Sequence, residues 1–329
     1  MEELYQLSIA LTTLMQEAYP RLLGVMSLIT ALGTAGFFLV FISSIYWCVD
    51  KRLGRQLGYI FLLSTFVNTI LKNLIRQPRP FWLEPEIGRY DVVEFGLPSG
   101  HVQNTTAVFL LLAATVRRTW LWVAAFVYIL LMGLSRLYLG VHFLQDIAVG
   151  FAAGLIILIA FLLWQQFYFA RFNKQILGRR LLLMVLIPTV LAAVYVGIYL
   201  LLGPVSEDVP WAAYVPAAEL SGYEAVVSTF GALLGFGVGI ILESSRIRFH
   251  ADGPVWKRIL RFVLGMAGTA GIWAGLRVVF PTTPLWLGLP LHFLRYLLIL
   301  LWVTYFAPWV FVLLRLALAD PESEVHVTL

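Results

Sequence analysis

The sequence predicts an all-α integral membrane protein, a multi-pass helical bundle of about nine transmembrane helices. Three observations support this fold class. Hydrophobic residues make up 60% of the 329-residue chain and charged residues 12%, whereas soluble domains carry about 25% charge. Apolar stretches near the roughly 20 residues that cross a bilayer recur along the whole chain. Basic residues gather in every second connection between these stretches.

Residues 1–18 carry Leu and Met at helical spacing among Glu and Gln, which predicts an amphipathic helix in the membrane interface. A simple extension packed on the bundle is the alternative. Glu2 and Glu3 stand where a signal peptide would be basic, so no cleaved leader is expected. Residues 19–170 should form a core bundle and 171–329 an additional four-helix transmembrane region. The predicted spans are 22–48, 56–75, 101–116, 119–138, 142–167, 181–202, 225–242, 260–280 and 291–314.

The basic residues predict the orientation of these spans. Of 23 Lys and Arg residues, 15 follow odd-numbered spans, and such residues favour the cytoplasmic side. The N-terminus should therefore lie outside and the C-terminus in the cytoplasm, with the 76–100 loop facing outward. Compact loops favour a bacterial inner membrane, with this face towards the periplasm or exterior. The net charge of +5 sits in short runs between spans, so no nucleic-acid partner is expected. The single cysteine, Cys48, allows no disulfide within the chain.

The stretch Ser135–Asp146, SRLYLGVHFLQD, places ionisable residues among Leu and Phe at a membrane boundary, where such groups are usually functional. His142 and Asp146 are four residues apart, which predicts that they share one face of a helix. A carboxylate beside a histidine fixes its tautomer and stabilises the imidazolium, and Arg136 adds a guanidinium suited to phosphate. Taken alone, the stretch could also be an ordinary helix end with a capped Asp and a buried His.

Two further segments precede it: KNLIRQPRP, which holds Lys72 and Arg79, and PSGH, from Pro98 to His101. Written as K-x6-R-P, P-S-G-H and S-R-x5-H-x3-D, the three segments match all signatures of the type-2 phosphatidic-acid phosphatase superfamily, in order and without substitution. The chain resembles that superfamily over about residues 55–165, and its last four spans lie outside the shared signature. The resemblance implies an integral-membrane phosphatase.

Phosphoryl transfer depends on positioning negative charge and stabilising it in the transition state. Lys72, Arg79 and Arg136 supply three cations for this purpose. Ser99 and Gly100 should open a helix whose N–H groups can hold phosphate oxygens. The resemblance also places Ser135 near the phosphate, although the residue could merely cap a helix end.

The resemblance implies that His142 attacks phosphorus and forms a phosphohistidine, with Asp146 orienting its ring. His101 would protonate the leaving group and then activate water. Because the sequence has no Cys cluster and few carboxylates for a metal cage, no cofactor and a metal-independent reaction are expected. The acidic residues of the 76–100 loop could shape headgroup selectivity, but simple loop solubility is the favoured reading. They are Glu84, Glu86, Asp91 and Glu94.

The predicted function is removal of a terminal phosphate from a lipid phosphate or diphosphate on the extracytoplasmic face, with membrane lipids as partners. Polyprenyl diphosphate, phosphatidate, phosphatidylglycerophosphate and sphingoid phosphates are the candidate substrates. The topology also resembles glucose-6-phosphatase, so a sugar phosphate is an alternative. A lipid phosphotransferase would use the same residues. A lipid transporter or scramblase with a vestigial site is the alternative from a different class.

Overall fold

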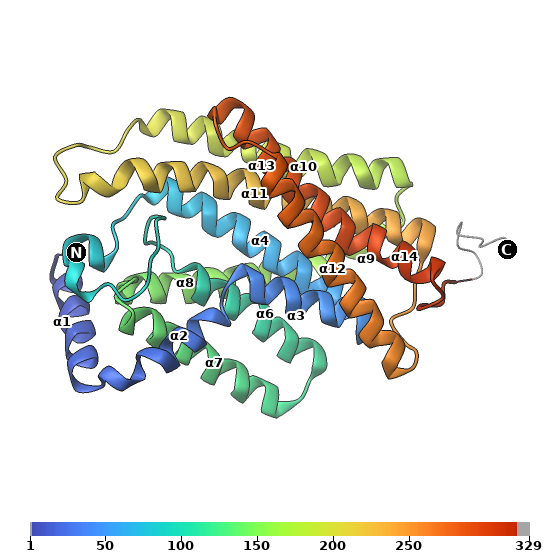
Figure 1. The fold of residues 1–329 in the computed structure, drawn as a ribbon, viewed down its shortest axis with the longest axis horizontal. Coiled ribbons are helices and arrows are strands. Elements are labelled where there is room, and N and C mark those ends of the chain that lie inside the picture. The colour runs from blue at the N-terminus through green and yellow to red at the C-terminus, as the bar shows by residue number, and fades with distance from the viewer. Residues whose placement is uncertain (1, 321–329) are drawn as a thin grey trace. The chain divides into compact units, whose positions relative to one another are not determined.

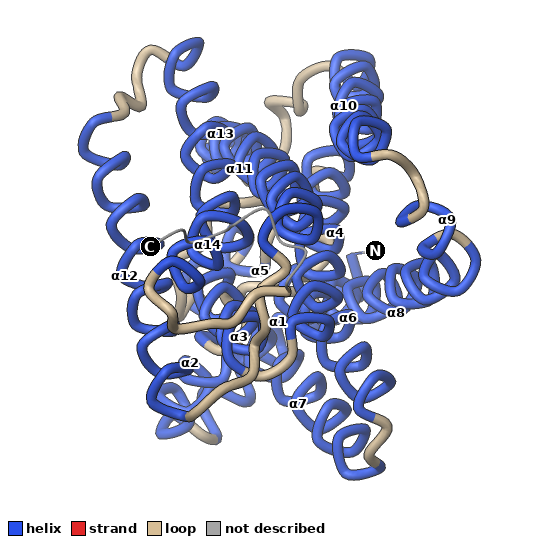
Figure 2. The backbone as a smooth tube through the Cα atoms, turned by 90° about the vertical axis from the view of Figure 1, so that its right-hand side faces the viewer, coloured by secondary structure: helices blue, strands red, loops and turns tan. Residues whose placement is uncertain are grey.

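The computed structural model describes residues 2–320, and this part of the chain is built from α-helices (Figure 1). Within it no β-strand forms, and extended pairing is limited to an isolated antiparallel bridge between Phe249 and Ala319 (Figure 2). The predicted all-α membrane class is therefore confirmed. Met1 and the tail 321–329, with which the predicted C-terminal region ends, lie outside the described residues.

The helices follow one another with short connections, apart from those between α5 and α6, before α11, and between α11 and α12. Their bounds are α1 Glu2–Ala18, α2 Leu23–Ala31, α3 Ala35–Cys48, α4 Lys51–Ile75, α5 Pro80–Leu83, α6 Gly100–Val116, α7 Thr119–Tyr138, α8 Leu144–Phe167, α9 Phe169–Asn173, α10 Leu177–Leu202, α11 Val215–Leu242, α12 Val255–Val279, α13 Leu285–Leu301 and α14 Ala307–Leu313.

Seven helical segments of the described chain are long and apolar enough to cross a membrane. An eighth span results if α2 and α3, which are bent by 50°, count as one. The remaining predicted span corresponds to α6, which has only 17 residues and so rises about 26 Å, less than the roughly 30 Å of a hydrocarbon core. Every predicted span thus coincides with helix, while the total of nine and the orientation of the termini stay predictions.

The described residues divide into two compact units. The first holds residues up to Phe38, Leu63–Phe161 and Tyr195–Ala225, and the second holds Leu39–Leu62, Leu162–Val194 and the residues from Val226 on. All three signature segments belong to the first unit. The predicted boundary near residue 170 stays a prediction.

Within the first unit, a buried polar network fixes the start of α6 against α4. The amide of Asn68 donates to the carbonyl of Pro98 (3.2 Å) and to the side-chain oxygen of Gln103 (2.9 Å). Gln103 in turn donates to the Ser64 carbonyl (2.8 Å). Buried amides that satisfy one another in this way hold their helices in one register, because a shifted helix would leave them unpaired. The network therefore positions the turn that carries the PSGH segment.

Candidate active site

The side chains of the three signature segments lie at helix ends of the first unit. Lys72 is in the last turn of α4, and Arg79 directly precedes α5. Ser99 is the N-cap of α6, whereas Arg136 is in the last turn of α7. Helix ends carry backbone groups without intrahelical partners, so polar side chains and ligands can be held there.

Arg79 joins the loop before α6 to the loop between α7 and α8. Its guanidinium is buried and donates to the carbonyls of Glu94 and Phe95 on one side, the latter at 3.1 Å. On the other side, Nη1 donates to the carbonyl of Val141 (2.8 Å) and lies 3.3 Å from Nε2 of His142. A planar fork of five donors suits this bridging position, and a lysine could not reproduce it.

The contacts of His142 define its tautomer. A guanidinium can only donate, so Nε2 of His142, facing Arg79, must be the nitrogen that carries no proton. Nδ1 then carries the proton and donates to Oδ2 of Asp146 at 3.2 Å. Burial, followed by the fields of Arg79 and Arg136, holds the pKa of the His142 imidazole well below its usual range. The ring is therefore neutral, with Nε2 available as a nucleophile.

The prediction that His142 and Asp146 share a helix face is wrong, although the two side chains do meet. His142 lies in the turn before α8, which begins at Leu144. The Asp146 carboxylate reaches back from the first turn and also accepts the N–H of Phe143 (3.0 Å). This second bond caps the helix and fixes the carboxylate beside the histidine.

Gly140 makes the sharp exit from α7 possible. Its φ is +70°, a conformation open to glycine, and a Cβ there would come within 2.3 Å of the Ile87 carbonyl oxygen. Any larger residue would push the turn away from the loop at Ile87. The chain can therefore turn directly from Arg136 towards His142.

Ser99 connects the PSGH segment to the SRLYLGVHFLQD segment. Its backbone N–H donates to the carbonyl of Asp146 (3.0 Å), and its own carbonyl accepts the N–H of Gln103 at 3.0 Å. The first N–H groups of α6, at Gly100 and His101, have no intrahelical partner by their position. The start of α6 thus offers backbone donors beside the His142 turn, as an oxyanion site requires.

Ser135 and Arg136 are held by a residue that the sequence analysis did not identify, Thr30 of α2. Arg136 donates through Nη1 to the Thr30 hydroxyl (3.0 Å), and Ser135 Oγ lies 3.2 Å from the same hydroxyl. The Arg136 guanidinium also lies 5.4 Å from the ring centre of Tyr90. Thr30 is one of several hydroxyl residues in its predicted span, such as Ser27 and Thr34, and nothing in that pattern indicated an arginine partner.

Glu94 corrects the expectation that the loop acids only keep the loop soluble. Its carboxylate Oε2 lies 2.5 Å from Nζ of Lys72, whose side chain is 8% exposed against 41% for Glu94. The Lys72 ammonium lowers the pKa of the Glu94 carboxyl to about 2, so the group is ionised at neutral pH. Lys72 is therefore one half of an ion pair with Glu94.

His101 lies in the first turn of α6 and packs closely on the break between α2 and α3. A Cβ added to Gly33 at that break would come within 2.7 Å of the His101 ring carbon Cδ2.

Several buried polar atoms of these residues have no hydrogen-bond partner among the described residues. They are Ser99 Oγ, His101 Nε2, Arg136 Nε and Asp146 Oδ1. Unpaired buried donors cost free energy unless a ligand satisfies them. Together with the cations Lys72, Arg79 and Arg136, the first three suit a bound oxyanion. Between residues 2 and 320 no group of three or more His, Cys, Asp or Glu side chains is placed to hold a metal ion.

Arg76, which lies between Lys72 and Arg79 and matches no signature position, takes no part in this cluster. It donates to the carbonyls of Asn73 (2.9 Å) and Gly203, and it lies 4.3 Å from the ring centre of Tyr199. Its role in the first unit is therefore to bridge α4 to the end of α10.

Comparisons with known proteins agree with the signature segments and extend beyond them. Residues 53–172 match the family model of the PAP2 superfamily. Residues 227–319 match the model described as the PAP2 superfamily phosphatase, transmembrane extension. The similarity thus reaches the last three predicted spans, although the resemblance read from the sequence covered only about residues 55–165.

Three relatives illustrate the range of similar proteins. Sphingosine-1-phosphate phosphatase 2 of Mus musculus is 33% identical over 129 residues, which are 36% of this chain and 36% of that protein. Phosphatidylglycerophosphatase B of Bacillus subtilis (strain 168) is 30% identical over 151 residues, 42% of this chain and 72% of that protein. Glucose-6-phosphatase catalytic subunit 1 of Bos taurus is 24% identical over 259 residues, 67% of this chain and 70% of that protein. The match therefore spans little more than a third of the mouse protein.

Proposed function

Because the chain belongs to the PAP2 superfamily, we propose that it is a membrane phosphatase that removes the terminal phosphate of a lipid phosphate or diphosphate. The observation that carries this proposal is the geometry of His142, whose free Nε2 faces Arg79 while Nδ1–H faces Asp146. An amphiphilic substrate could place its phosphate between the helix ends and keep its chains in the membrane.

The first step forms a bond between His142 Nε2 and phosphorus and breaks the bond from phosphorus to the leaving oxygen. Asp146 stabilises the positive charge that develops on the ring, as a carboxylate beside a histidine does in other nucleophilic sites. Lys72, Arg79 and Arg136 neutralise the charge on the phosphoryl oxygens, assisted by N–H groups at the start of α6. His101 donates a proton to the leaving oxygen, so the alcohol or phosphate departs protonated at that oxygen.

The second step returns the enzyme to its starting state. Water attacks phosphorus, the P–N bond to His142 breaks, and His101 takes the proton of the attacking water. Before the first step His101 must hold a proton among three cations, and the negative charge of the bound phosphate favours this. The reaction therefore needs no metal ion, which makes insensitivity to EDTA an expected property.

The face of the membrane is part of the proposal. Under the nine-span topology, the 76–100 loop and the His142 turn face the periplasm or the exterior, because most basic residues follow the odd-numbered spans. Substrates would then enter from the outer leaflet. A cysteine introduced in the 76–100 loop tests this orientation. A membrane-impermeant reagent applied to intact cells should label it.

A sugar phosphate is the second candidate substrate. The supporting observation is that the alignment with the bovine glucose-6-phosphatase subunit covers 67% of this chain, well beyond the signature segments. Coverage alone does not separate the two substrate classes, because sphingosine-1-phosphate phosphatase 1 of Mus musculus aligns over 72% of this chain. The deciding property is whether the phosphate needs an acyl or prenyl chain to be hydrolysed. A lipid preference would appear as a much higher kcat/KM for amphiphilic than for water-soluble phosphates.

The experiment is a substrate panel on the purified protein, scored by released phosphate without any added acceptor. The panel holds a sphingoid phosphate, phosphatidylglycerophosphate, phosphatidate, a polyprenyl diphosphate and a hexose phosphate. His142→Ala should abolish turnover and phosphoenzyme formation. The matched control is His250→Ala, since His250 is exposed and pairs with Asp320 in the second unit. Full activity in His142→Ala would remove the mechanism.

The same experiment separates the remaining alternatives. A phosphotransferase would release little phosphate until a lipid or sugar alcohol is added as acceptor. A scramblase with a vestigial site would move lipids between leaflets equally well in the wild type and in His142→Ala.

A further inference from the structure

The N-terminal helix α1 turns a polar stripe inward and an apolar stripe outward. Ser8, Thr12 and Gln16, four residues apart, are 0%, 0% and 9% exposed. Leu7 and Leu14 on the other side are 49% and 62% exposed. This is the reverse of a helix on a soluble protein, whose apolar stripe faces the core. The buried polar side chains must therefore have specific partners.

Two of these partners are carbonyl groups at the C-terminal end of α7. The Thr12 hydroxyl lies 3.0 Å from the Leu137 carbonyl oxygen, and the amide of Gln16 donates to the Tyr138 carbonyl at 2.7 Å. Gln16 also donates to the carbonyl of Ile87 (2.9 Å), which packs against the turn at Gly140. The Leu137 carbonyl also accepts the N–H of Gly140 (3.0 Å). The last carbonyls of a helix have no partner within it, so Gln16 satisfies that of Tyr138 from outside.

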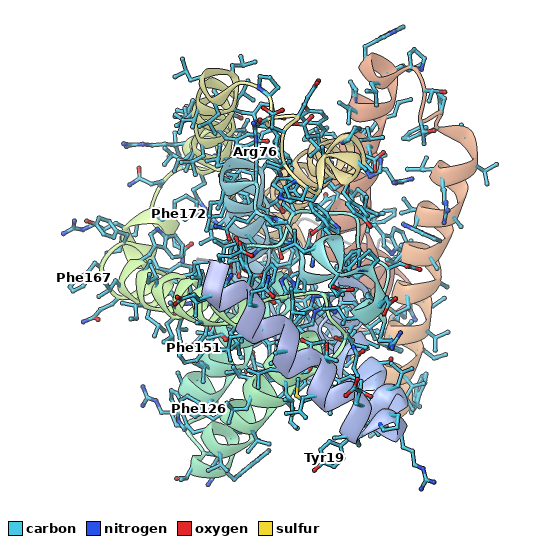
Figure 3. The ribbon with its side chains drawn as sticks, turned by 90° about the vertical axis from the view of Figure 1, so that its left-hand side faces the viewer. Tyr19, Arg76, Phe126, Phe151, Phe167 and Phe172 are labelled. Carbon is cyan, nitrogen blue, oxygen red and sulfur yellow. The ribbon has the colours of Figure 1, made fainter. Side chains whose placement is uncertain are left out.

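The third partner is at the N-terminal end of α8. The backbone N–H of Leu144, the first residue of α8, donates to the Ser8 hydroxyl at 3.1 Å. The Tyr5 ring also lies against the Phe143 ring, with 4.3 Å between their centres. Figure 3 shows α1 in front, crossing the ends of other helices of the first unit, with Tyr19 just beyond its own end.

From these contacts we infer that α1 caps the C-terminal end of α7 and the N-terminal end of α8. It thereby positions the catalytic His142, which lies in the turn between them. Ser8, Thr12 and Gln16 are positioning residues, because their contacts end on the backbone that flanks the nucleophile. Among the described residues, Lys72, Arg79 and Arg136 form their hydrogen bonds with groups outside α1, so we expect phosphate binding to depend on α1 less than the attack of His142 does. The inference rests on the proposed function, since it concerns the attack of His142 on phosphorus.

The test is Gln16→Met, which keeps the length of the side chain and removes both donors. Its matched control is Gln6→Met on the same helix, since Gln6 is exposed and bonds only to Glu2 in its own helix (3.1 Å). A second pair is Thr12→Val, which keeps the shape and removes the hydroxyl, and Thr12→Ser, which retains it. A displacement of about 1 Å at a reacting atom can cost about 100-fold in rate.

The readout is the rate constant of phosphoenzyme formation per reactive site, with the number of sites taken from the burst amplitude. We expect Gln16→Met to lower this rate constant about 10- to 100-fold, with KM and competitive inhibition by inorganic phosphate within about twofold of wild type. Thr12→Val should show a smaller loss that Thr12→Ser restores, and Gln6→Met should equal wild type.

If α1 only stabilises the fold, Gln16→Met will contain fewer reactive sites, but each will react at the wild-type rate, and this result overturns the inference. A fall of phosphate affinity equal to the fall in rate would also overturn it, because α1 would then hold the cations. Failure of the proposed function looks different, because the wild type itself would release no phosphate and form no phosphoenzyme.

Discussion

Replacing Asp146 by Asn should slow the attack of His142 on phosphorus and leave the fold unchanged. Oδ2 of Asp146 accepts both hydrogen bonds of this carboxylate, from Nδ1 of His142 (3.2 Å) and from the N–H of Phe143 (3.0 Å). Oδ1 is buried and has no partner among the described residues. An asparagine can put its oxygen in the place of Oδ2 and its NH2 group in the place of Oδ1. Both bonds then persist, and only the negative charge is lost.

The size of the effect follows from the change in that one hydrogen bond. During attack the His142 ring becomes positively charged, so the hydrogen bond from its Nδ1 to Asp146 then joins two charged groups. A hydrogen bond to a charged group contributes about 1.5–3 kcal/mol and a neutral one about 0.5–1.5 kcal/mol, a difference of about 1–2 kcal/mol. At about 1.4 kcal/mol for each tenfold, the rate should fall about 5- to 30-fold.

The N–H of Phe143 keeps this loss small. In a serine-protease triad, the same substitution costs about 10⁴ in kcat because the free amide imposes the wrong tautomer on the histidine. Here the Phe143 N–H requires an oxygen in front of it, which holds the amide in the orientation that accepts from Nδ1. The structure therefore predicts a loss hundreds of times smaller than that of the triad.

The assay is rapid-quench measurement of phosphoenzyme formation, with melting temperature in detergent as the measure of the fold. Asp146→Ala is the companion variant: it leaves both donors unpaired, so it should also destabilise the protein by about 1–3 kcal/mol per donor. A wild-type rate in Asp146→Asn would refute a role for the charge. A loss near 10⁴ with normal stability would refute the anchoring by Phe143.

Four other outcomes are expected. Arg79→Lys should keep the charge yet lose contact with at least two of the four groups that Arg79 reaches, and destabilise the protein by about 2–4 kcal/mol in thermal unfolding. Glu94→Gln should free Lys72 and lower the inhibition constant of inorganic phosphate by about three- to tenfold; a rise would mean that Glu94 holds Lys72 in place for catalysis. Because the folded-state pKa of His142 is lowered, the unfolded chain takes up the proton first, so stability should fall as pH drops below about 6.5, more steeply in wild type than in His142→Asn. EDTA should not change turnover, and loss of activity that Mg²⁺ restores would contradict a metal-free reaction.

The sequence predicted the helices well because spans of a membrane bundle are long, apolar and bounded by charged or turn residues. That Lys72, Ser99 and His142 form one phosphate site stays a prediction, and it followed from a resemblance and not from spacing. The helix assignment at His142 failed for a local reason. A spacing of four fits one helix face, but it fits equally a side chain that reaches back across the start of a helix, as Asp146 does.

The partners of the site residues could not be predicted, because they come from tertiary contacts that leave no periodic signal. Glu94 has the composition of any loop acid, and only its distance to Lys72 distinguishes it from its neighbours. Thr30 is one of five Ser and Thr residues in the predicted span 22–48, and only its contact with Arg136 distinguishes it. The stripe of Ser8, Thr12 and Gln16 was visible in the sequence, but leucines at helical spacing suggested the opposite face as the packed one.

These findings share one physical cause. Backbone groups inside a bilayer must be satisfied within the helix, so a membrane protein can offer free N–H and carbonyl groups mainly where its helices end. A phosphate site needs such donors, and the candidate residues accordingly lie at the ends of α4, α6, α7 and α8. Helix ends fray unless they are capped, so a site built only from helix ends requires caps from elsewhere in the chain. In this protein Thr30 holds Arg136, and Gln16 caps the end of α7. The residues that support catalysis should therefore be sought among single polar side chains that reach helix ends, even when they lie far from the signature segments in the sequence.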